Sequence, residues 1–240
     1  MARALHHVRC GEVVYEDGLA WQRALWEARR AGELEDVLLT LTHDPVYTAG
    51  RHADLDRNLL RSDTGVRVVE VERGGDLTYH GPGQLVAYPI VGLASSKDVR
   101  WFVDALLTAC QRTVAAFGVE ATPDPRRPGL WVGDDKLAAI GVRVDQRVTF
   151  HGLALNVAPD LAQFQAGIVP CGIADAGVCS LASLGATAEL ENVRDRLVHE
   201  LGVALDRDPV ASGPQVEAAR ALAPTADERP CADRLPSAQG

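Results

Sequence analysis

The chain has 240 residues, of which 47% are hydrophobic and 24% are charged, and its formal net charge is −9. This length is enough to bury one sizeable core or two small ones. The acidic balance argues against a protein that wraps nucleic acid, which usually needs a basic face. No run approaches the roughly 18 apolar residues of a membrane helix, and the N-terminal residues lack the apolar stretch of a signal peptide, so we expect a cytoplasmic protein.

The first half of the chain reads as strands with one helix. Alternating or continuous apolar residues predict strands at 4–15, 37–42, 66–72 and 84–93, and a helix between the first two, over 16–33. Between the last two strands lies "RGGDLTYHGPGQ" (73–84), which holds four glycines. Because glycine allows tight turns and close backbone approach to a ligand, this segment is either an elaborate loop or a binding site.

The second half begins with a strong amphipathic pattern, which predicts a helix over 98–118. Residues 129–157 read as three short strands separated by the turn-like triplets "GDD" and "DQR", which is typical of an antiparallel meander. Residues 160–185 are loop-rich with one helical turn, and 187–202 form a final amphipathic helix.

These elements favour one α/β domain with a mixed sheet. We expect a single catalytic domain over 1–210. After Pro209 the sequence turns to Pro, Ala, Asp and Ser with little periodicity, which predicts a disordered tail over 211–240.

The five cysteines are irregularly spaced, and no C-x-x-C motif occurs among them: Cys10, Cys110, Cys171, Cys179 and Cys231. This pattern indicates reduced thiols, without a disulfide framework or a zinc site. His6, His7 and Cys10 look superficially like metal ligands. Adjacent strand residues point to opposite faces, however, so we expect no metal.

Four segments carry a family resemblance, and they occur in the family's order: "RGGDLTYHGPGQLVAYPI" (73–90), "GDDKLAAIGVR" (133–143), "HGLALNV" (151–157) and "IVPCGIADAGVCSL" (168–181). Together they resemble the lipoyl(octanoyl) transferase family. The resemblance implies the α/β (α+β) fold of biotin and lipoate protein ligases, with a mixed, largely antiparallel sheet flanked by helices.

The resemblance also implies an activity and its partners. Such an acyltransferase moves an octanoyl group from octanoyl-acyl carrier protein to a lysine of a lipoyl domain, the first step of endogenous lipoate biosynthesis. The acceptors would be the E2 subunits of 2-oxoacid dehydrogenases and the glycine cleavage H protein. The reaction exchanges one thioester for another, so no cofactor and no ATP are expected.

Two residues match the family's catalytic pair: Cys171 as the acyl-carrying thiol and Lys136 as the lysine that activates it. A free thiol with a pKa of about 8.5 is only a few per cent thiolate at pH 7, and a neighbouring cation increases that share. Lys136, with His80 and His151 behind it, is also the candidate to take a proton from the acceptor lysine.

The family pattern further assigns residues that line the acyl substrate. They are Arg73, Gly74, Gly75, Asp76, Leu77, Thr78, Tyr79, His80, Ala139, Ile140, Gly141, His151, Gly152 and Leu153. The glycines at 74 and 75 would let the alkyl chain lie against the backbone. Ala139 departs from the family, which often has a small hydroxylic residue there, so one polar contact stays open.

Three other functions are compatible with parts of the sequence. An ATP-dependent lipoate ligase would have a histidine–aspartate pair, whereas His80 is followed by "GPGQ". A Cys-dependent thioesterase or amidase would use Cys171 with a histidine base and water, and the sequence alone leaves that alternative open. A non-catalytic acyl-binding protein would not need both Cys171 and Lys136.

Overall fold

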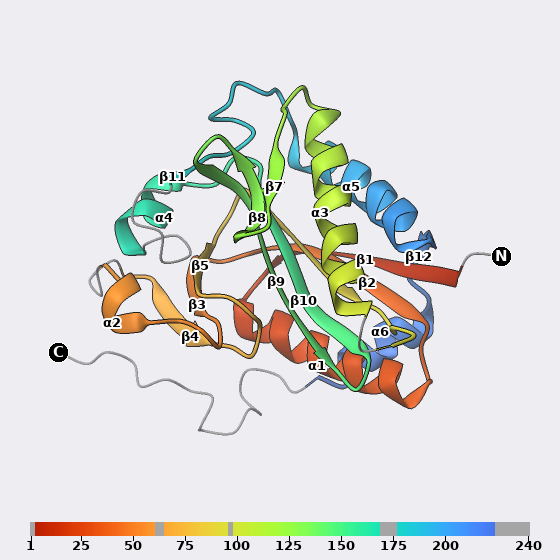
Figure 1. The fold of residues 1–240 in the computed structure, drawn as a ribbon. Coiled ribbons are helices and arrows are strands. Elements are labelled where there is room, and N and C mark those ends of the chain that lie inside the picture. The colour runs from red at the N-terminus through yellow and green to blue at the C-terminus, as the bar shows by residue number, and fades with distance from the viewer. Residues whose placement is uncertain (1–2, 61–64, 96–97, 169–176, 224–240) are drawn as a thin grey trace.

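The computed structural model describes residues 3–60, 65–95, 98–168 and 177–223 (Figure 1). The strands are β1 (Arg3–Val13), β2 (Asp36–His43), β3 (Val46–Ala49), β4 (Arg67–Glu70), β5 (Leu77–His80), β6 (Gln84–Ile90), β7 (Thr122–Asp124), β8 (Arg127–Val132), β9 (Asp135–Asp145), β10 (Val148–Asn156), β11 (Gly177–Val178) and β12 (Arg207–Ala211). The helices are α1 (Tyr15–Ala31), α2 (Leu55–Asn58), α3 (Val99–Ala115), α4 (Leu161–Gly167), α5 (Leu190–Leu205) and α6 (Pro214–Ala221).

The larger of two sheets has nine strands in the order β12-β1-β2-β6-β10-β9-β8-β7, with β11 paired to β9. Its central pairs β2–β6, β6–β10, β10–β9 and β9–β8 are antiparallel, whereas β1 runs parallel to both β2 and β12. This confirms the predicted mixed, largely antiparallel sheet, and β8–β9–β10 is the predicted meander.

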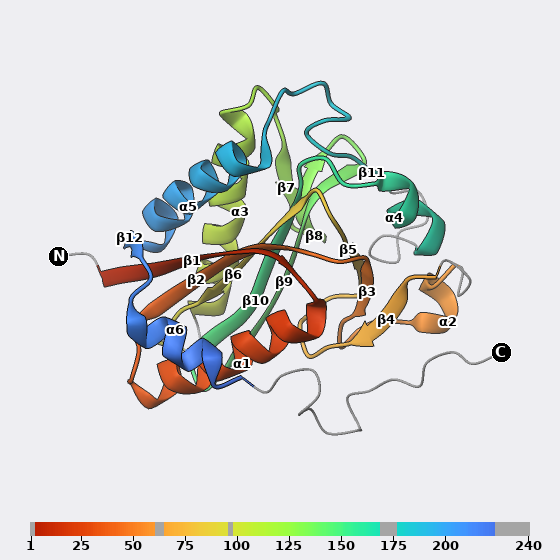
Figure 2. The ribbon, with the colours of Figure 1, turned by 180° about the vertical axis from the view of Figure 1, so that it is seen from behind.

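Helices cover both faces of this sheet. Figures 1 and 2 show α3 and α5 on one face and α1 and α6 on the other. The side chains of the fully buried strand β6 point alternately to the two faces of the sheet, so this strand contributes to a hydrophobic core on each face. Leu85 and Ala87 pack with the α3 and α5 side, while Val86 and Tyr88 pack with the α1 and α6 side.

The second sheet has three strands in the order β4-β3-β5 and lies beside the large one (Figure 2). An ion-pair cluster joins it to the first helix: Arg67 on β4 bonds both Glu16 of α1, at 2.8 Å, and Asp44, at 2.6 Å. Its third strand, β5, lies inside the glycine-rich segment. That segment is therefore more than a connection between strands, because Leu77–His80 pair with β3 and are buried.

A buried carboxylate ties distant parts of the large sheet together. Asp36, 1% exposed, accepts bonds of 2.7 Å from both Arg29 of α1 and Arg207 of β12, and one of 2.9 Å from the Gly92 amide. The start of β2 is thereby fixed to one helix and to the edge strand.

Residues 211–223 differ from the tail predicted for them. They form the end of β12 and helix α6, which packs on α1 through Val216, 2% exposed. Arg220 of α6 also lies over the Trp21 ring, 4.8 Å from its centre. Residues 224–240 lie outside the described part of the chain.

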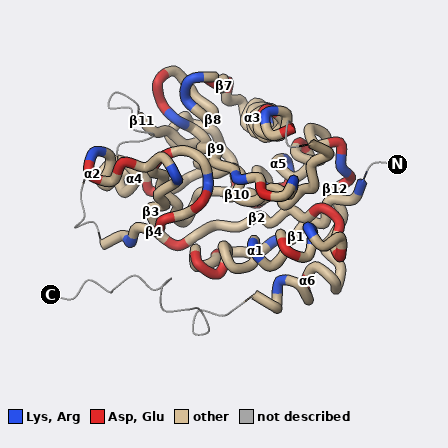
Figure 3. Tube along the Cα trace, turned by 60° about the horizontal axis from the view of Figure 1, so that its bottom comes forward, with Lys and Arg blue, Asp and Glu red and all other residues tan. Residues whose placement is uncertain are grey.

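Acidic and basic residues are interspersed along the trace in Figure 3, often as ion pairs. Arg127, for example, lies 2.7 Å from Asp124, and Arg143 lies 3.0 Å from Asp145. Of the described helices, none is long and apolar enough to cross a bilayer.

Candidate active site

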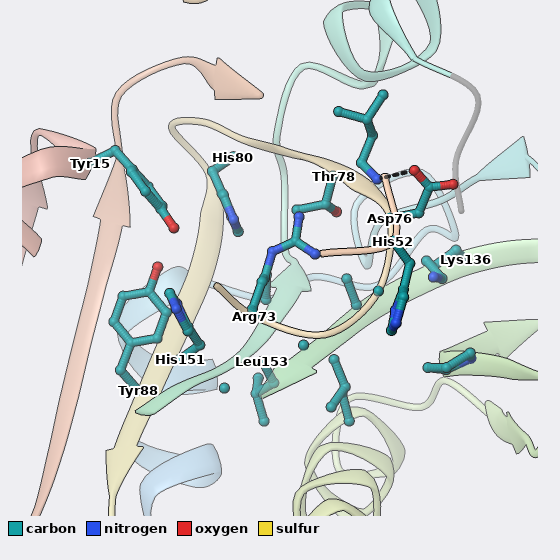
Figure 4. Close-up of a pocket in the computed structure, with 18 residues that line it drawn as sticks. Tyr15, His52, Arg73, Asp76, Thr78, His80, Tyr88, Lys136, His151 and Leu153 are labelled. Carbon is teal, nitrogen blue, oxygen red and sulfur yellow. Dashed lines mark hydrogen bonds between the residues drawn. The ribbon is translucent and has the colours of Figure 1, made fainter. Parts of the chain in front are cut away.

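A cavity of about 300 Å³ lies over one end of the large sheet, and the glycine-rich segment forms part of its wall (Figure 4). It is lined by Tyr15, His52, Arg73, Gly75, Asp76, Leu77, Thr78, His80, Tyr88, Pro128, Lys136, Ala139, Ile140, Gly141, His151, Gly152, Leu153 and Ala154. This volume is at the lower end of the range for small-molecule sites. The structure thus brings together residues from three of the four sequence segments.

Two residues predicted to line the substrate are not among those around the cavity. The Tyr79 hydroxyl donates to Gln163 of α4 at 2.7 Å, so its side chain is directed toward that helix. Gly74 is held by its amide, which donates to the Val142 carbonyl of β9 at 3.0 Å. Gly75 adopts φ +86°, a conformation that favours glycine, so the turn itself requires this residue.

Lys136 lies at the start of β9 and is only 1% exposed. Its Nζ lies 4.9 Å from the centre of the Trp131 ring, and a Cβ added at Gly129 would come within 3.4 Å of that Nζ. Its carbonyl accepts from the Cys179 amide at 3.1 Å. Burying a lysine is energetically costly, so the close packing of other residues around Lys136 indicates that its amine has a function.

Cys171 lies outside the described residues, so the structure gives no distance between its sulfur and Lys136. The residues that flank this segment are described on both sides. Upstream, Ile168 forms a β-bridge with Leu59, and downstream, Gly177 and Val178 pair with Asp135 and Lys136.

The neighbouring thiol, Cys179, has the properties of a structural residue. It is 4% exposed and contacts the Asp135 carbonyl at 3.7 Å. Burial, with the charge of Asp135, raises its pKa to about 12, which disfavours the thiolate.

Arg73 places a positive charge in the cavity wall. Its Nη2 donates to the carbonyl and hydroxyl of Thr48 at 2.6 and 2.7 Å, and Nη1 donates to the Gly74 carbonyl at 3.0 Å. A Cβ added at Gly141 would lie 2.9 Å from its Cδ, so the glycine makes room for the side chain.

His80 and His151 are neutral at pH 7. Burial, followed by the charge of Arg73, lowers the pKa of His151 to about 3, and burial, followed by the nearby His43 ring, lowers the pKa of His80. His151 also has φ +59°, and its buried Nε2 has no hydrogen-bond partner among the described residues.

Several lining residues were missed by the sequence prediction. Tyr15 and Tyr88 form an aromatic wall around His80 and His43, with Tyr15 stacked on His80 at 5.8 Å and the Tyr88 hydroxyl 2.8 Å from His43 Nε2. Tyr88 and Ala154 lie within the quoted segments 73–90 and 151–157, so the resemblance could have pointed to them. His52 and Pro128 lie outside these segments and had no signal.

Among the described residues, no three His, Cys, Asp or Glu side chains lie close enough together to bind a metal ion. The chemistry available there comes from a buried amine, neutral imidazoles and a guanidinium. That set can move protons and stabilise negative charge.

Comparisons with known proteins agree with this picture. Residues 14–202 match the lipoyl protein ligase A/B catalytic domain family. The fold is similar to that of a putative lipoate protein ligase from Thermoplasma acidophilum with bound lipoic acid. The TM-score is 0.74 at 16% identity, covering 92% of this chain and 94% of that one. The chain therefore belongs to the lipoyl protein ligase A/B catalytic domain family.

Two relatives with higher sequence identity make the family assignment more specific. The chain is 47% identical to an octanoyltransferase from Mycobacterium leprae over 203 residues, which is 82% of this chain and 86% of the relative. It is 42% identical over 219 residues to an octanoyltransferase from Myxococcus xanthus, covering 86% of this chain but only 61% of that longer protein. The chain belongs to the octanoyltransferase family.

Proposed function

We propose that this protein transfers an octanoyl group from octanoyl-acyl carrier protein to the target lysine of lipoyl domains, through a thioester on Cys171. The observation that carries the proposal is Lys136, a buried amine in the wall of the cavity, in a chain of the octanoyltransferase family. The acceptors would be the E2 subunits of 2-oxoacid dehydrogenases and the glycine cleavage H protein.

In the first half-reaction, the Cys171 thiolate, paired with the Lys136 ammonium, attacks the carbonyl carbon of the donor thioester. The carbon–sulfur bond to the carrier's pantetheine thiolate breaks, and the Lys136 ammonium protonates that leaving group. The products are octanoyl-Cys171, a neutral Lys136 and free carrier thiol. One thioester replaces another, so the acyl group stays activated without ATP.

In the second half-reaction, neutral Lys136 takes the first proton from the acceptor's ammonium group. The resulting amine attacks the octanoyl-Cys171 carbonyl, the Cys171 thiolate leaves, and the thiolate–ammonium pair with Lys136 is restored. Lys136 and the acceptor carry the same kind of amine, so the first can act as a general base toward the second.

The cavity supports an eight-carbon acyl group because most of its wall near Lys136 is apolar. Leu77, Ile140, Leu153 and Ala154 surround the glycines of β9 and β10. Burying six methylenes at about 0.8 kcal/mol each supplies at most roughly 5 kcal/mol of binding free energy, so shorter chains should bind less tightly.

The test is intact-mass spectrometry of the protein mixed with octanoyl-acyl carrier protein, followed by addition of a lipoyl domain. We expect an octanoyl adduct on the peptide that carries Cys171, and then octanoyl on the lipoyl-domain lysine, without ATP. Cys171→Ser should abolish both, and Lys136→Ala should slow both by about 100-fold or more.

The other outcomes identify the alternatives. An absolute requirement for ATP with free octanoate would indicate a ligase. Release of octanoate to water at the same rate with and without the lipoyl domain would indicate a thioesterase. An adduct on Cys179 would overturn the assignment of the thiol.

A further inference from the structure

The end of the cavity away from Lys136 is enclosed by hydrogen-bonding side chains. Tyr15, His80, Tyr88 and His151 line it, and between 1% and 6% of each is exposed. Tyr15 stacks on His80 at 5.8 Å, and the rings of Tyr88 and His151 lie 6.4 Å apart. These four residues are the polar end wall (Figure 4). Because they are buried, their polar atoms need partners within the protein or on a bound molecule.

The polar end wall lies several residues along the sheet from the Lys136 amine. A Cβ added at Gly129 would lie 2.5 Å from the Ala138 carbonyl and 3.4 Å from Lys136 Nζ, so the amine lies at the level of Ala138. His151 pairs with Val142, which is about 13 Å further along β9 at about 3.3 Å per residue. An extended acyl chain advances roughly 1.3 Å per bond, so eight carbons span about 9 Å. An octanoyl group that starts beside the amine therefore ends short of the wall.

The hydrogen of the Tyr88 hydroxyl is already used. His43 Nδ1 faces the Val13 carbonyl at 2.8 Å, and since a carbonyl can only accept, this nitrogen carries a hydrogen. Burial lowers the pKa of His43 to about 4, so the ring is neutral and its Nε2 is an acceptor. The Tyr88 hydroxyl, 2.8 Å away, donates to that nitrogen. Tyr88 Oη is left with lone pairs only, which makes it an acceptor toward the cavity.

His80 presents a second acceptor. Gln84 Nε2 donates to the Tyr79 carbonyl at 3.1 Å, which fixes this amide and leaves Oε1 to face His80 Nδ1 at 2.7 Å. His80 Nδ1 therefore carries a hydrogen. Burial, followed by the nearby His43 ring, lowers the pKa of His80, so the ring is neutral and Nε2 has a lone pair. Among the described residues, no group bonds this nitrogen or the Tyr15 hydroxyl.

The hydrogen-bonding groups of the polar end wall match one kind of ligand. Tyr88 Oη and His80 Nε2 accept, and the Tyr15 hydroxyl can donate as well as accept. Figure 4 shows the two tyrosine hydroxyls pointing toward one another across this end of the cavity. Water or an alcohol can donate one hydrogen bond here and accept another. A methyl group would leave all of these buried atoms unpaired, which is costly.

We propose that the polar end wall is a hydroxyl-binding site, which holds water when an octanoyl chain fills the cavity and disfavours the methyl end of longer chains. The direction of the chain, with its carbonyl beside Lys136, rests on the function proposed above. The wall then limits chain length through hydrogen bonding as well as through space. It should accept a longer chain that ends in a hydroxyl, since ten carbons and a hydroxyl oxygen span about 13 Å.

The test uses two acyl chains of the same length and shape that differ only at the end. Undecanoyl-acyl carrier protein has a methyl group where 10-hydroxydecanoyl-acyl carrier protein has a hydroxyl. An apolar wall would favour undecanoyl, because the hydroxyl would lose its hydration without a partner. We expect the wild type to load 10-hydroxydecanoyl with a kcat/KM at least about tenfold higher than that for undecanoyl, measured by intact mass against time.

Three tyrosine variants locate the hydroxyl preference. Tyr15→Phe and Tyr88→Phe each remove one oxygen from the wall, and each should reduce the preference to about threefold or less. Tyr47→Phe is the matched control, because Tyr47 is fully buried and its hydroxyl donates to the Gln163 carbonyl at 2.7 Å, away from the cavity. It should keep the wild-type preference. Because the preference is a ratio within one variant, partial unfolding does not change it.

The proposal is overturned if the wild type loads undecanoyl as well as 10-hydroxydecanoyl, or if Tyr15→Phe and Tyr88→Phe both keep the full preference. Binding of the free acids, 10-hydroxydecanoate and undecanoate, measured by calorimetry, tests the wall without acyl transfer. The hydroxy acid should bind more tightly, and equal binding would also overturn the proposal. If this order holds but the wild type loads no octanoyl, only the proposed function is refuted, so the two failures are distinguishable.

Discussion

At the scale of single residues, the clearest constraint is the space around Lys136. Trp131 covers its amine from one side and the backbone of β8 approaches from another, at Gly129. Gly129 has φ +141°, a backbone conformation that side chains rarely adopt. A glycine is therefore needed at position 129 for two reasons: the backbone conformation of β8 and the space that the Lys136 side chain occupies.

Gly129→Ala should damage transfer more than stability alone explains. Its new Cβ would lie 2.5 Å from the Ala138 carbonyl and 3.0 Å from Lys136 Cε, so the lysine has to move. We expect a loss of about 1–3 kcal/mol in the free energy of unfolding. Octanoyl loading should fall at temperatures where the variant is fully folded, as measured by urea unfolding and intact mass.

Gly133→Ala is the matched control, because this glycine also has a positive φ, +60°, but its added Cβ would meet nothing within 4 Å. It should lose about 1 kcal/mol and load octanoyl like the wild type. Equal loading by both variants would show that the contact with Lys136 does not matter.

At the scale of elements, α6 shows how a short helix depends on its tertiary contacts. It has eight residues, too few for a helix to be stable alone. Val216 packs into the core beneath α1, and Arg220 covers Trp21 and bonds Cys10 Sγ at 3.6 Å.

Val216→Ala should therefore loosen α6. Removing buried methyl groups costs about 1–2 kcal/mol. Leu222→Ala, at the end of the same helix and 83% exposed, should change stability by less than about 0.5 kcal/mol. Hydrogen exchange of the α6 amides should accelerate only in the first variant, and acceleration in neither would place the helix's stability elsewhere.

The elements that could be predicted from the sequence are those with a local pattern. Helix α3 shows a clear apolar stripe, and β8–β9–β10 are separated by recognisable turns. Strands β3, β5, β7, β11 and β12 were missed because each has five residues or fewer and is defined by its pairing partner, as β12 is by β1. Helix α6 was missed because Val216 is its only fully buried side chain, and the remaining apolar residues are alanines, which give a weak periodic signal.

The residues of the site also fall into two groups: those that a sequence motif indicates and those that only the folded chain brings together. Residues within the quoted motifs, such as Arg73, His80 and Lys136, could be assigned to the substrate from resemblance. Tyr15 and His52 come from other parts of the chain and reach the cavity only through packing. Gln84 bonds both Asn156, at 3.0 Å, and His80, at 2.7 Å, and these contacts depend on the pairing of β6 with β10, which no local pattern reveals.

At the scale of the whole molecule, several buried and neutral histidines lie in one region. His43, His80 and His151 are all buried, and burial lowers the pKa of His43 to about 4 and that of His151 to about 3. His43 lies 5.6 Å from His80, ring centre to ring centre, so a charge on one raises the cost of charging the other.

This arrangement makes stability depend on pH in a defined direction. In the unfolded chain these histidines bind a proton below pH 6.5, whereas in the folded protein they stay neutral well below that. The unfolded state thus holds more protons between pH 6.5 and about 4, and the free energy of unfolding falls as the pH falls. Each buried histidine contributes up to about 1.4 kcal/mol per pH unit.

The prediction is that urea unfolding of the wild type shows full stability at pH 7.5 and a steep loss between pH 6.5 and 4.5. These three histidines together contribute up to about 4 kcal/mol per pH unit, a large share of the 5–15 kcal/mol that holds a typical domain folded. His7, whose pKa burial lowers to about 4, adds to the loss. His43→Gln should be less stable at pH 7.5, because the bonds to Val13 and Tyr88 are lost, but should show a shallower slope below pH 6.5. His199→Gln, at an exposed position of α5, is the matched control and should keep the wild-type slope. If His43→Gln and wild type lose stability in parallel as the pH falls, His43 is already charged in the folded protein, and the acid sensitivity has to arise from other groups.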